Sequence, residues 1–197
     1  MSRGSHETEI KLRLANRAEG LRRLRAAGFR VSKRRVFEAN AVYDTPGSDM
    51  RNRAELLRLR EAGGVNTITY KGPPDIARHK SREELEVEVS RAPAARLILE
   101  RLGYCAAFRY EKYRTELKSR KAGGVAVLDE TPIGVYLELE GSPKWIDRTA
   151  RELGFEEREY ITSSYGRLYR EWCMLQGVAP ADMVFEGRSK RKSGRSG

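Results

Sequence analysis

Several segments of this chain place a charged side chain at every second position and an apolar one between. Residues 7–13, for example, read Glu-Thr-Glu-Ile-Lys-Leu-Arg. Successive side chains of a β-strand point to opposite faces, so this segment has one charged face and one apolar face. Residues 57–60, 84–89 and 137–140 alternate in the same way. The chain therefore builds a sheet with one strongly charged face, and its fold must keep that face in a polar environment.

The charges on these strands are sorted by sign. Residues 84–88 and 138–140 carry Glu at alternate positions, whereas Arg58 and Arg60 form a cationic pair. A sheet face that is open to water usually mixes the two signs, so that neighbouring strands can pair. We therefore expect a sheet that curls into a barrel, with helices on its apolar outer face and the charges around a wet interior. The alternative is a plain structural domain whose charges face solvent.

A unit made of a strand, a helix and a glycine followed by an aromatic residue occurs three times, over residues 7–29, 84–104 and 136–155. The predicted helices span about residues 18–27, 93–102 and 144–153. Each glycine stands where a helix C-cap is expected. A further helical run follows Ser163 toward Trp172, and we expect its Tyr165 to pack against the barrel.

Two hairpins separate these units. Residues 56–71 and 110–129 each hold two strand-like runs joined by Ala-Gly-Gly-Val, and residues 36–44 add another strand. The pattern predicts an α+β fold: about eight strands, largely antiparallel, with an internal two-fold repeat and at least three helices.

Composition limits the remaining possibilities. The 197 residues suffice for one domain, which we place at residues 1–186. Residues 187–197 hold five of the basic residues behind the net charge of +11, with no acid, and we expect a disordered basic tail. That tail offers a nucleic-acid or polyphosphate contact as an alternative to plain solvation. No apolar run indicates a membrane span or an export signal, so we expect a cytoplasmic protein. The two cysteines exclude a zinc finger or a disulfide scaffold.

A barrel interior with this lining has a definite chemical use. Carboxylates two residues apart are hard oxygen ligands that suit Mg²⁺ or Mn²⁺. Arg and Lys suit phosphate oxygens, and Arg binds them in bidentate fashion. Together they describe a site for a metal-bound polyphosphate.

The run Glu7-x-Glu9-x-Lys11 resembles the signature of the CYTH family, also called triphosphate tunnel metalloenzymes. Further blocks resemble that family in the same order, at residues 43–46, 57–60, 69–73, 81–84, 111–114, 128–130 and 138–140. The resemblance covers roughly residues 5–172. It implies an eight-stranded antiparallel tunnel with a charged interior, helices packed outside, and metal-dependent chemistry on triphosphate compounds.

The resemblance also implies roles for individual residues. The divalent ions, Mg²⁺ or Mn²⁺, would be held by Glu7, Glu9, Asp129, Glu138 and Glu140. The phosphates would be bound by Lys11, Arg58, Arg60, Lys71, Arg82 and Arg114. Lys112 would be catalytic and assist in activating water. The chain departs from the family along one strand, where it has Glu38, Asn40 and Val42 in place of the more usual Gln, Asp and Tyr.

Three functions remain open from the sequence. The first is a triphosphatase acting on tripolyphosphate, thiamine triphosphate or a nucleoside triphosphate. The second is a class IV adenylyl cyclase that converts ATP to cyclic AMP and pyrophosphate, for which no residue of the sequence identifies an adenine pocket. The third is a non-catalytic module that binds polyphosphate or RNA, and the paired acids argue against it. We also expect His79, in a polar connection, to be solvated, and we leave the oligomeric state open.

Overall fold

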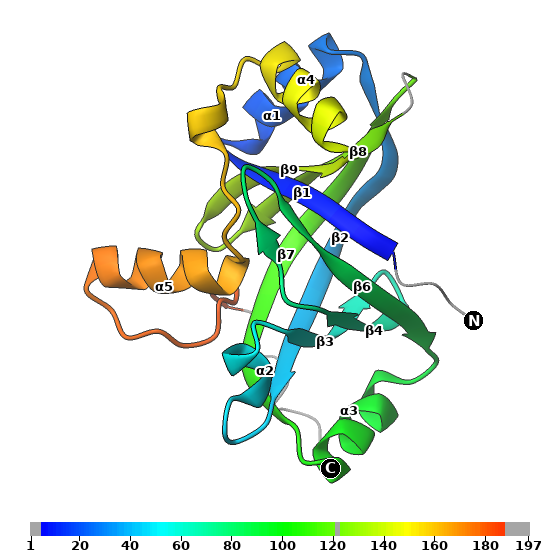
Figure 1. Ribbon diagram of the computed structural model, residues 1–197, viewed down its shortest axis with the longest axis vertical. Coiled ribbons are helices and arrows are strands. Elements are labelled where there is room, and N and C mark those ends of the chain that lie inside the picture. The colour runs from blue at the N-terminus through cyan, green and yellow to red at the C-terminus, as the bar shows by residue number, and fades with distance from the viewer. Residues whose placement is uncertain (1–4, 121–122, 188–197) are drawn as a thin grey trace.

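The strands form a closed antiparallel barrel (Figure 1). A computed structural model describes residues 5–120 and 123–187. Its strands are β1 (Ser5–Leu14), β2 (Phe29–Asp44), β3 (Leu56–Ala62), β4 (Val65–Lys71), β5 (Asp75–Ile76), β6 (Lys80–Val89), β7 (Cys105–Ser119), β8 (Gly124–Thr131) and β9 (Gly134–Gly141). They lie in the order β1-β9-β8-β7-β2-β3-β4-β6, and β6 pairs back onto β1. This closure confirms the predicted eight-stranded tunnel, while the short β5 adds only to β6.

The helices pack on the outside of the barrel, as the alternation predicts. Helices α1 (Arg17–Ala26) and α4 (Pro143–Glu152) lie together at one end, and α3 (Ala92–Arg101) lies at the other (Figure 1). Helix α5 (Tyr165–Gln176) stands at one side, and the short α2 (Asp49–Asn52) and η1 (Glu157–Glu159) complete the set in the described residues. Each of α1, α3 and α4 is followed by a glycine with positive φ, at Gly28, Gly103 and Gly154, which confirms the repeated unit.

The main hydrophobic core lies between the barrel wall and the helices α1 and α4. Ile10 and Leu12 of β1 are fully buried there, together with Leu24 of α1 and Ile146 of α4. Burying one such side chain stabilises the fold by about 1.5–3 kcal/mol. Because these apolar residues occupy the outer face of the barrel, the charged residues that alternate with them point inward.

Glycines allow the α4 side chain Trp145 to lie directly on the β8–β9 hairpin. A Cβ on Gly124 would lie 2.5 Å from the carbonyl oxygen of Glu140 and 2.5 Å from the Trp145 ring. Only a residue without a side chain fits between them. This packing fixes the end of β9, the strand that carries Glu138 and Glu140.

Strand β2 differs from the prediction, which began it at residue 36. It starts at Phe29 and pairs with β7 from the Phe29–Ser119 pair onward. The register shifts between Val31 and Lys33 and again before Val36, so the period-two pattern is interrupted there. The predicted tail lies, apart from Gly187, outside the described residues, as does part of the second Ala-Gly-Gly-Val turn. Within the described residues, no helix has both the length and the apolar character that crossing a bilayer requires.

Candidate active site

The interior of the barrel holds a large cavity of about 1160 Å³. Of the twelve site residues predicted from the sequence, all except Asp129 line this cavity. They reach it from β1, β3, β4, β6, β7 and β9, because each lies on the inward parity of its strand. Asp129, on β8, is fully buried behind the lining side chains.

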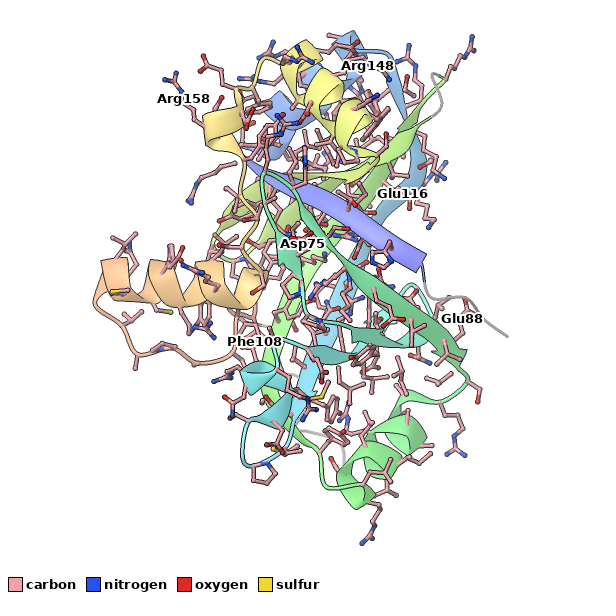
Figure 2. All side chains as sticks on the ribbon, viewed as in Figure 1. Asp75, Glu88, Phe108, Glu116, Arg148 and Arg158 are labelled. Carbon is pink, nitrogen blue, oxygen red and sulfur yellow. The ribbon has the colours of Figure 1, made fainter. Side chains whose placement is uncertain are left out.

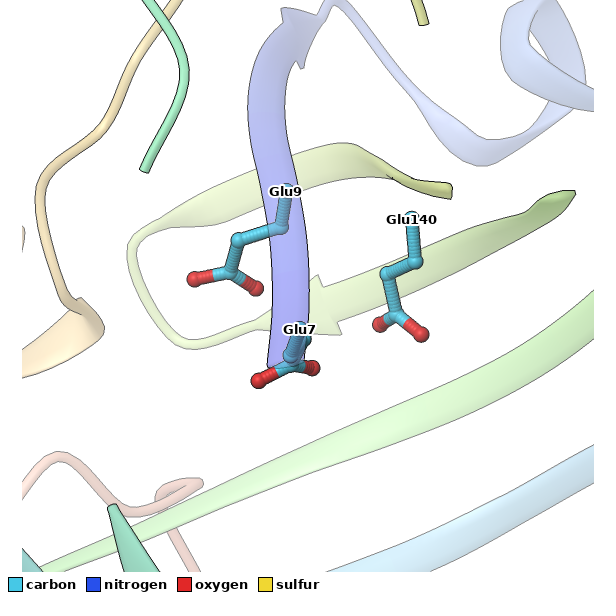
Figure 3. A group of neighbouring side chains, drawn as sticks. All are labelled: Glu7, Glu9 and Glu140. Carbon is cyan, nitrogen blue, oxygen red and sulfur yellow. The ribbon is translucent and has the colours of Figure 1, made fainter. Parts of the chain in front are cut away.

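Three of the predicted acids meet in this cavity (Figure 3). Glu7, Glu9 and Glu140 each offer one carboxylate oxygen, and these oxygens lie within 4.8 Å of one another. Glu7 and Glu9 share one face of β1, and Glu140 lies opposite Glu9 in the β1–β9 register. A cluster of carboxylates from two strands is the donor set that Mg²⁺ or Mn²⁺ prefers. The three residues therefore fit a divalent ion.

Cations surround Glu9 within the cluster. Its Oε1 accepts hydrogen bonds from Lys11 Nζ at 3.1 Å and from Lys80 Nζ at 2.9 Å. Burial by itself raises the pKa of Glu9, but Lys11, Lys80 and Lys71 lower it well below its usual value. Burial lowers the pKa of Lys80 to about 8, partly offset by Glu9. Glu9 thus stays ionised and keeps its second oxygen free of these lysines.

Glu140 has a different environment. Among the described residues, Glu140 pairs with Arg114, whose Nη1 lies 3.9 Å from Glu140 Oε1. Burial raises the pKa of Glu140 to about 7, and the negative charges of Glu138, Glu7 and Glu9 add to the shift despite Arg114. A cation placed among these acids would relieve their repulsion.

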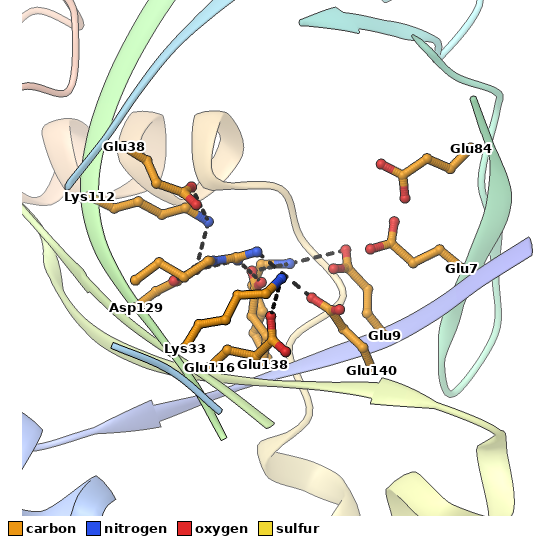
Figure 4. A network of polar contacts seen from close by, with 12 residues as sticks. Glu7, Glu9, Lys33, Glu38, Glu84, Lys112, Glu116, Asp129, Glu138 and Glu140 are labelled. Atoms are coloured by element: carbon orange, nitrogen blue, oxygen red, sulfur yellow. Dashed lines mark hydrogen bonds and ion pairs between the residues drawn. The ribbon is translucent and has the colours of Figure 1, made fainter. Parts of the chain in front are cut away.

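Asp129 and Glu138 form a second group, linked to the first (Figure 4). Asp129 accepts hydrogen bonds from Lys112 Nζ at 2.8 Å, from Arg114 Nε and Nη2 at 2.8 and 2.7 Å, and from Tyr165 Oη at 2.9 Å. Burial favours the protonated acid, but Arg114 and Lys112 lower the pKa of Asp129 to about 2. Glu138 pairs with Arg114 and with Lys11 Nζ at 3.3 Å. The structure thus places these two predicted metal ligands as counter-ions of the cations, apart from the cluster of Glu7, Glu9 and Glu140.

The predicted phosphate ligands of β3 and β4 line the same cavity as the acids. Arg58 donates to Thr69 Oγ1 at 3.1 Å and to Tyr110 Oη at 3.4 Å. Arg60 donates to Glu86 at 2.8 Å. Lys71 pairs with Glu7 and lies 3.3 Å from Glu84 Oε1.

Arg82, the last predicted phosphate ligand, lies opposite Glu7 in the β1–β6 register. Its Nε is buried and has no hydrogen-bond partner among the described residues. A guanidinium nitrogen in this position is available to an anion in the cavity.

Sequence reasoning missed several residues of this interior. Lys80 lies two residues before Arg82 on β6 and points to the same inner face as Arg82 and Glu84. Following the alternation two residues further toward the start of the strand would have identified it. Glu38 is buried beside Lys112, 3.7 Å from its Nζ. Tyr165 does pack against the barrel, but it also donates to Asp129.

The prediction that His79 is solvated is wrong. Its side chain is only 9% exposed, and its Nε2 lies 2.7 Å from Asp147 Oδ1 on α4. Pairing of β6 with β1 brings the preceding residues against α4, a contact that the local sequence does not indicate.

Comparisons with known proteins agree with this geometry. The family model of the CYTH domain matches residues 5–165. A protein of Methanocaldococcus jannaschii named putative adenylate cyclase is 30% identical over 136 residues, which cover 69% of this chain and 77% of that protein.

Solved structures show the same fold. The PH1819 protein of Pyrococcus horikoshii superposes with a TM-score of 0.72 and 27% identity, over 84% of this chain and 99% of that one. The putative adenylyl cyclase HpAC1 of Hippeastrum superposes with a TM-score of 0.59 and 20% identity, over 88% of this chain and 97% of that one.

Proposed function

The chain belongs to the CYTH domain family, and we propose that it is a divalent-metal-dependent enzyme that hydrolyses triphosphate compounds. One observation carries this proposal: the acids Glu7, Glu9 and Glu140 and a ring of arginines and lysines line the same cavity. Phosphate binding alone needs the cations and gains nothing from a carboxylate cluster. A site that takes both a metal ion and a triphosphate needs both sets.

The charge balance of the interior supports this ligand. The buried acids and bases now neutralise one another, and removing one partner of such a pair is costly. A triphosphate with its metal ion gives both kinds of side chain a new partner. The phosphates pair with the lysines and arginines, and the metal ion pairs with the acids. The metal ion cancels part of the negative charge of the triphosphate, so the interior gains less charge than it would from the triphosphate alone.

We propose a role for each group of residues. Glu7, Glu9 and Glu140 would hold the ion, which when bound would withdraw charge from the phosphate groups. The phosphate chain would be oriented by six cations, which would also stabilise the negative charge that develops on the leaving group. These cations are Lys11, Arg58, Arg60, Lys71, Arg82 and Arg114. A water molecule would attack the terminal phosphorus in line with the bridging oxygen, whose bond to that phosphorus breaks. The products are orthophosphate and the shortened phosphate chain, and the proton lost by the water passes to a phosphate oxygen or to solvent.

Lys112 serves this reaction as a cation rather than as a base. Burial and the nearby Arg114 lower its pKa, but Asp129, Glu138 and Glu38 together raise it above the usual value. The ammonium group therefore keeps its proton at neutral pH. It lies 2.8 Å from Asp129 and can stabilise charge on a phosphate oxygen.

A class IV adenylyl cyclase is the second candidate. The Methanocaldococcus jannaschii relative bears the name of an adenylate cyclase, and a ribose hydroxyl can replace water as the nucleophile over the same charged lining. The Hippeastrum protein shares that name and is described as having a dominant triphosphatase activity. We place hydrolysis first because it needs no second reacting group to be positioned.

Product analysis tests the proposal. The protein is incubated with tripolyphosphate and, separately, with ATP, in Mg²⁺, in Mn²⁺ and in EDTA, and orthophosphate, pyrophosphate and cyclic AMP are quantified. We expect orthophosphate that depends on the metal and is lost in Glu7→Gln. The matched control is Glu130→Gln, since Glu130 lies on the outer face and pairs with Arg35 and Arg17. Cyclic AMP with pyrophosphate would favour the cyclase, and no turnover of either compound would contradict the enzyme.

A further inference from the structure

Tyr165, the first residue of α5, reaches into the barrel. It is buried, it lines the cavity, and its ring faces two lysines from different strands. Lys11 Nζ of β1 lies 5.4 Å from the centre of the Tyr165 ring, and Lys112 Nζ of β7 lies 5.1 Å from it. An ammonium group within about 6 Å of a ring centre is attracted by the negative face of the ring. One ring therefore interacts with two cations of the site.

Both ammonium groups are buried, which strengthens this attraction. Lys11 is 3% exposed and Lys112 is 2% exposed, so little water competes with the ring. Each lysine also pairs with two carboxylates on the barrel strands. These are Glu9 and Glu138 for Lys11, and Glu38 and Asp129 for Lys112. The ring belongs to a helix outside those strands, so it adds a contact that the barrel alone does not provide.

The hydroxyl group of Tyr165 makes a third contact with the charged residues. Tyr165 Oη lies 2.9 Å from Asp129 Oδ2, the oxygen that also accepts a hydrogen bond from Lys112 Nζ at 2.8 Å. An ionised carboxylate can only accept, so the phenol is the donor. Tyr165, Lys112 and Asp129 thus contact one another in a closed triangle, in which a shift of one side chain disturbs the other two.

The chain that leads into α5 holds Tyr165 in this place. Lys11 N donates to Ile161 O at 2.8 Å, and Ile161 N donates to Lys11 O at 2.9 Å. Ser164 then caps α5, because its Oγ accepts a hydrogen bond from Arg167 N at 3.3 Å. The segment before α5 is therefore bonded to the backbone of Lys11, the same residue whose ammonium group lies over the Tyr165 ring.

Neighbouring rings restrict the orientation of the Tyr165 ring. Its centre lies 6.2 Å from that of Tyr110 on β7 and 5.6 Å from that of Tyr136 on β9, with interplanar angles of 35° and 76°. One turn further along the helix, Tyr169 stacks on Phe108 of β7 at 5.9 Å, on the side of the barrel where α5 lies (Figure 2). Packing thus fixes the ring before any ligand is bound.

We propose that Tyr165 is a positioning residue for the reaction, which holds the ammonium groups of Lys11 and Lys112 where they meet phosphate oxygens. This inference rests on the proposed function, which assigns both lysines to the phosphates. Without the ring, each lysine would be held only by its carboxylates, and a phosphate would have to draw it away from them. A tyrosine that only filled space would need its volume but not its electron-rich face.

Calorimetric affinity for diimidotriphosphate, an analogue of tripolyphosphate, tests the proposal in Mg²⁺ without turnover. Tyr165→Phe keeps the ring and loses only the hydrogen bond to Asp129, so it is the reference. Tyr165→Leu removes the ring and should bind the analogue about tenfold more weakly than Tyr165→Phe, within the range that cation–π contacts support.

Fluorination of the ring separates its charge distribution from its shape. Position 165 is filled with phenylalanine that carries two and then three ring fluorines, which withdraw electron density from the face of the ring. The affinity should fall stepwise from that of Tyr165→Phe toward that of Tyr165→Leu. These side chains keep almost the same volume, so the series remains decisive even if Tyr165→Leu does not fold.

The matched control is Trp172→Leu. Trp172 lies on the same helix and packs in the same hydrophobic cluster as Tyr165, but it does not line the cavity. Its loss should loosen α5 while leaving the affinity within about twofold of that of the natural protein.

The outcomes separate this inference from the proposed function. Equal affinities along the fluorine series, or equal losses in Tyr165→Leu and Trp172→Leu, would overturn the positioning role even if triphosphates are hydrolysed. A stepwise loss would support it even if no turnover is found. A natural protein that does not bind the analogue at all would overturn the proposed function and this inference together.

Discussion

Glu9 and Glu140 lie opposite each other in the β1–β9 register, yet their environments shift their pKa values in opposite directions. Glu9 has two lysines on one oxygen, at 2.9 and 3.1 Å, and its pKa falls despite burial. Glu140 has one arginine at 3.9 Å and three acids nearby, and burial raises its pKa to about 7. The cluster thus holds one firmly ionised carboxylate beside one that readily takes a proton or a cation.

Glu140→Gln should stabilise the metal-free protein at pH 8 and flatten the dependence of its stability on pH. In the folded protein Glu140 keeps its proton up to about pH 7, whereas the usual value is 4.5. The contribution of Glu140 to the free energy of unfolding therefore falls as the pH rises from about 4.5 through 7, and a neutral amide avoids this loss.

Thermal unfolding in EDTA at pH 5 and pH 8 measures this effect, with each kcal/mol moving the Tm by about 2–4 °C in a chain of this size. Added Mg²⁺ should raise the Tm of the natural protein at pH 8 and have little effect on the variant. An unchanged pH slope in Glu140→Gln would show that this carboxyl titrates normally.

Asp129→Asn should be among the most destabilising single changes. It leaves Lys112 and Arg114 buried without the carboxylate that both of them contact. Removing one partner of a buried ion pair costs about 3–5 kcal/mol. Urea denaturation measures the loss.

The control for Asp129→Asn is its neighbour on the other face of β8. Glu130 pairs with Arg35 and Arg17, whose side chains are 39% and 43% exposed. Glu130→Gln should cost no more than about 1 kcal/mol, as is typical of surface pairs. Similar losses in the two variants would contradict the inward placement of Asp129.

Lys80→Gln should weaken the binding of triphosphate. Lys80 is buried, lines the cavity and shares Glu9 Oε1 with Lys11. The glutamine keeps a donor but loses the charge, and a hydrogen bond to a charged group is worth about 1.5–3 kcal/mol, so KM should rise about tenfold or more. Titration of turnover against tripolyphosphate measures it, with Lys144→Gln on α4 as the control. An unchanged KM would show that Lys80 neutralises Glu9 but does not contribute to the binding of triphosphate.

The sequence predicts local features of this fold well, because they depend on short-range periodicity. The alternation around Ile10 places Glu9 and Lys11 inside, and the glycine after each of α1, α3 and α4 marks where that helix ends. These features need no knowledge of distant residues. The same applies to the choice of cavity-lining residues, since parity alone determines which face a side chain occupies.

Contacts between distant strands could not be predicted in this way. Alternation does not reveal that β6 closes onto β1 and brings Lys80 to Glu9, or that Asp129 lies against Lys112 rather than among the other acids. The stack of Phe108 on Tyr169 was missed for the same reason. Its rings come from β7 and α5, and only the tertiary fold brings them together.

The connection between β4 and β6 offers the last prediction, because Asp147 of α4 holds it in place. Asp147 accepts hydrogen bonds from Arg78 at 2.7 Å, from His79 Nε2 at 2.7 Å and from Tyr160 Oη at 3.3 Å. Burial, followed by the charge of Asp147, raises the pKa of Tyr160 to about 12, so the phenol keeps its proton as a donor. The residue after His79 is Lys80, which reaches Glu9.

Asp147→Asn keeps the shape of the side chain but removes its charge and one of its acceptor oxygens. We expect faster amide hydrogen exchange in residues 72–80 and a higher KM for triphosphate with little change in kcat, because Lys80 loses its support while the reacting groups remain. The control is Glu157→Gln, since the Glu157 side chain is 62% exposed and pairs with the same Arg78 at 3.3 Å. Exchange rates that stay the same in Asp147→Asn, or rise as much in Glu157→Gln, would show that this connection is held by the β1–β6 pairing alone.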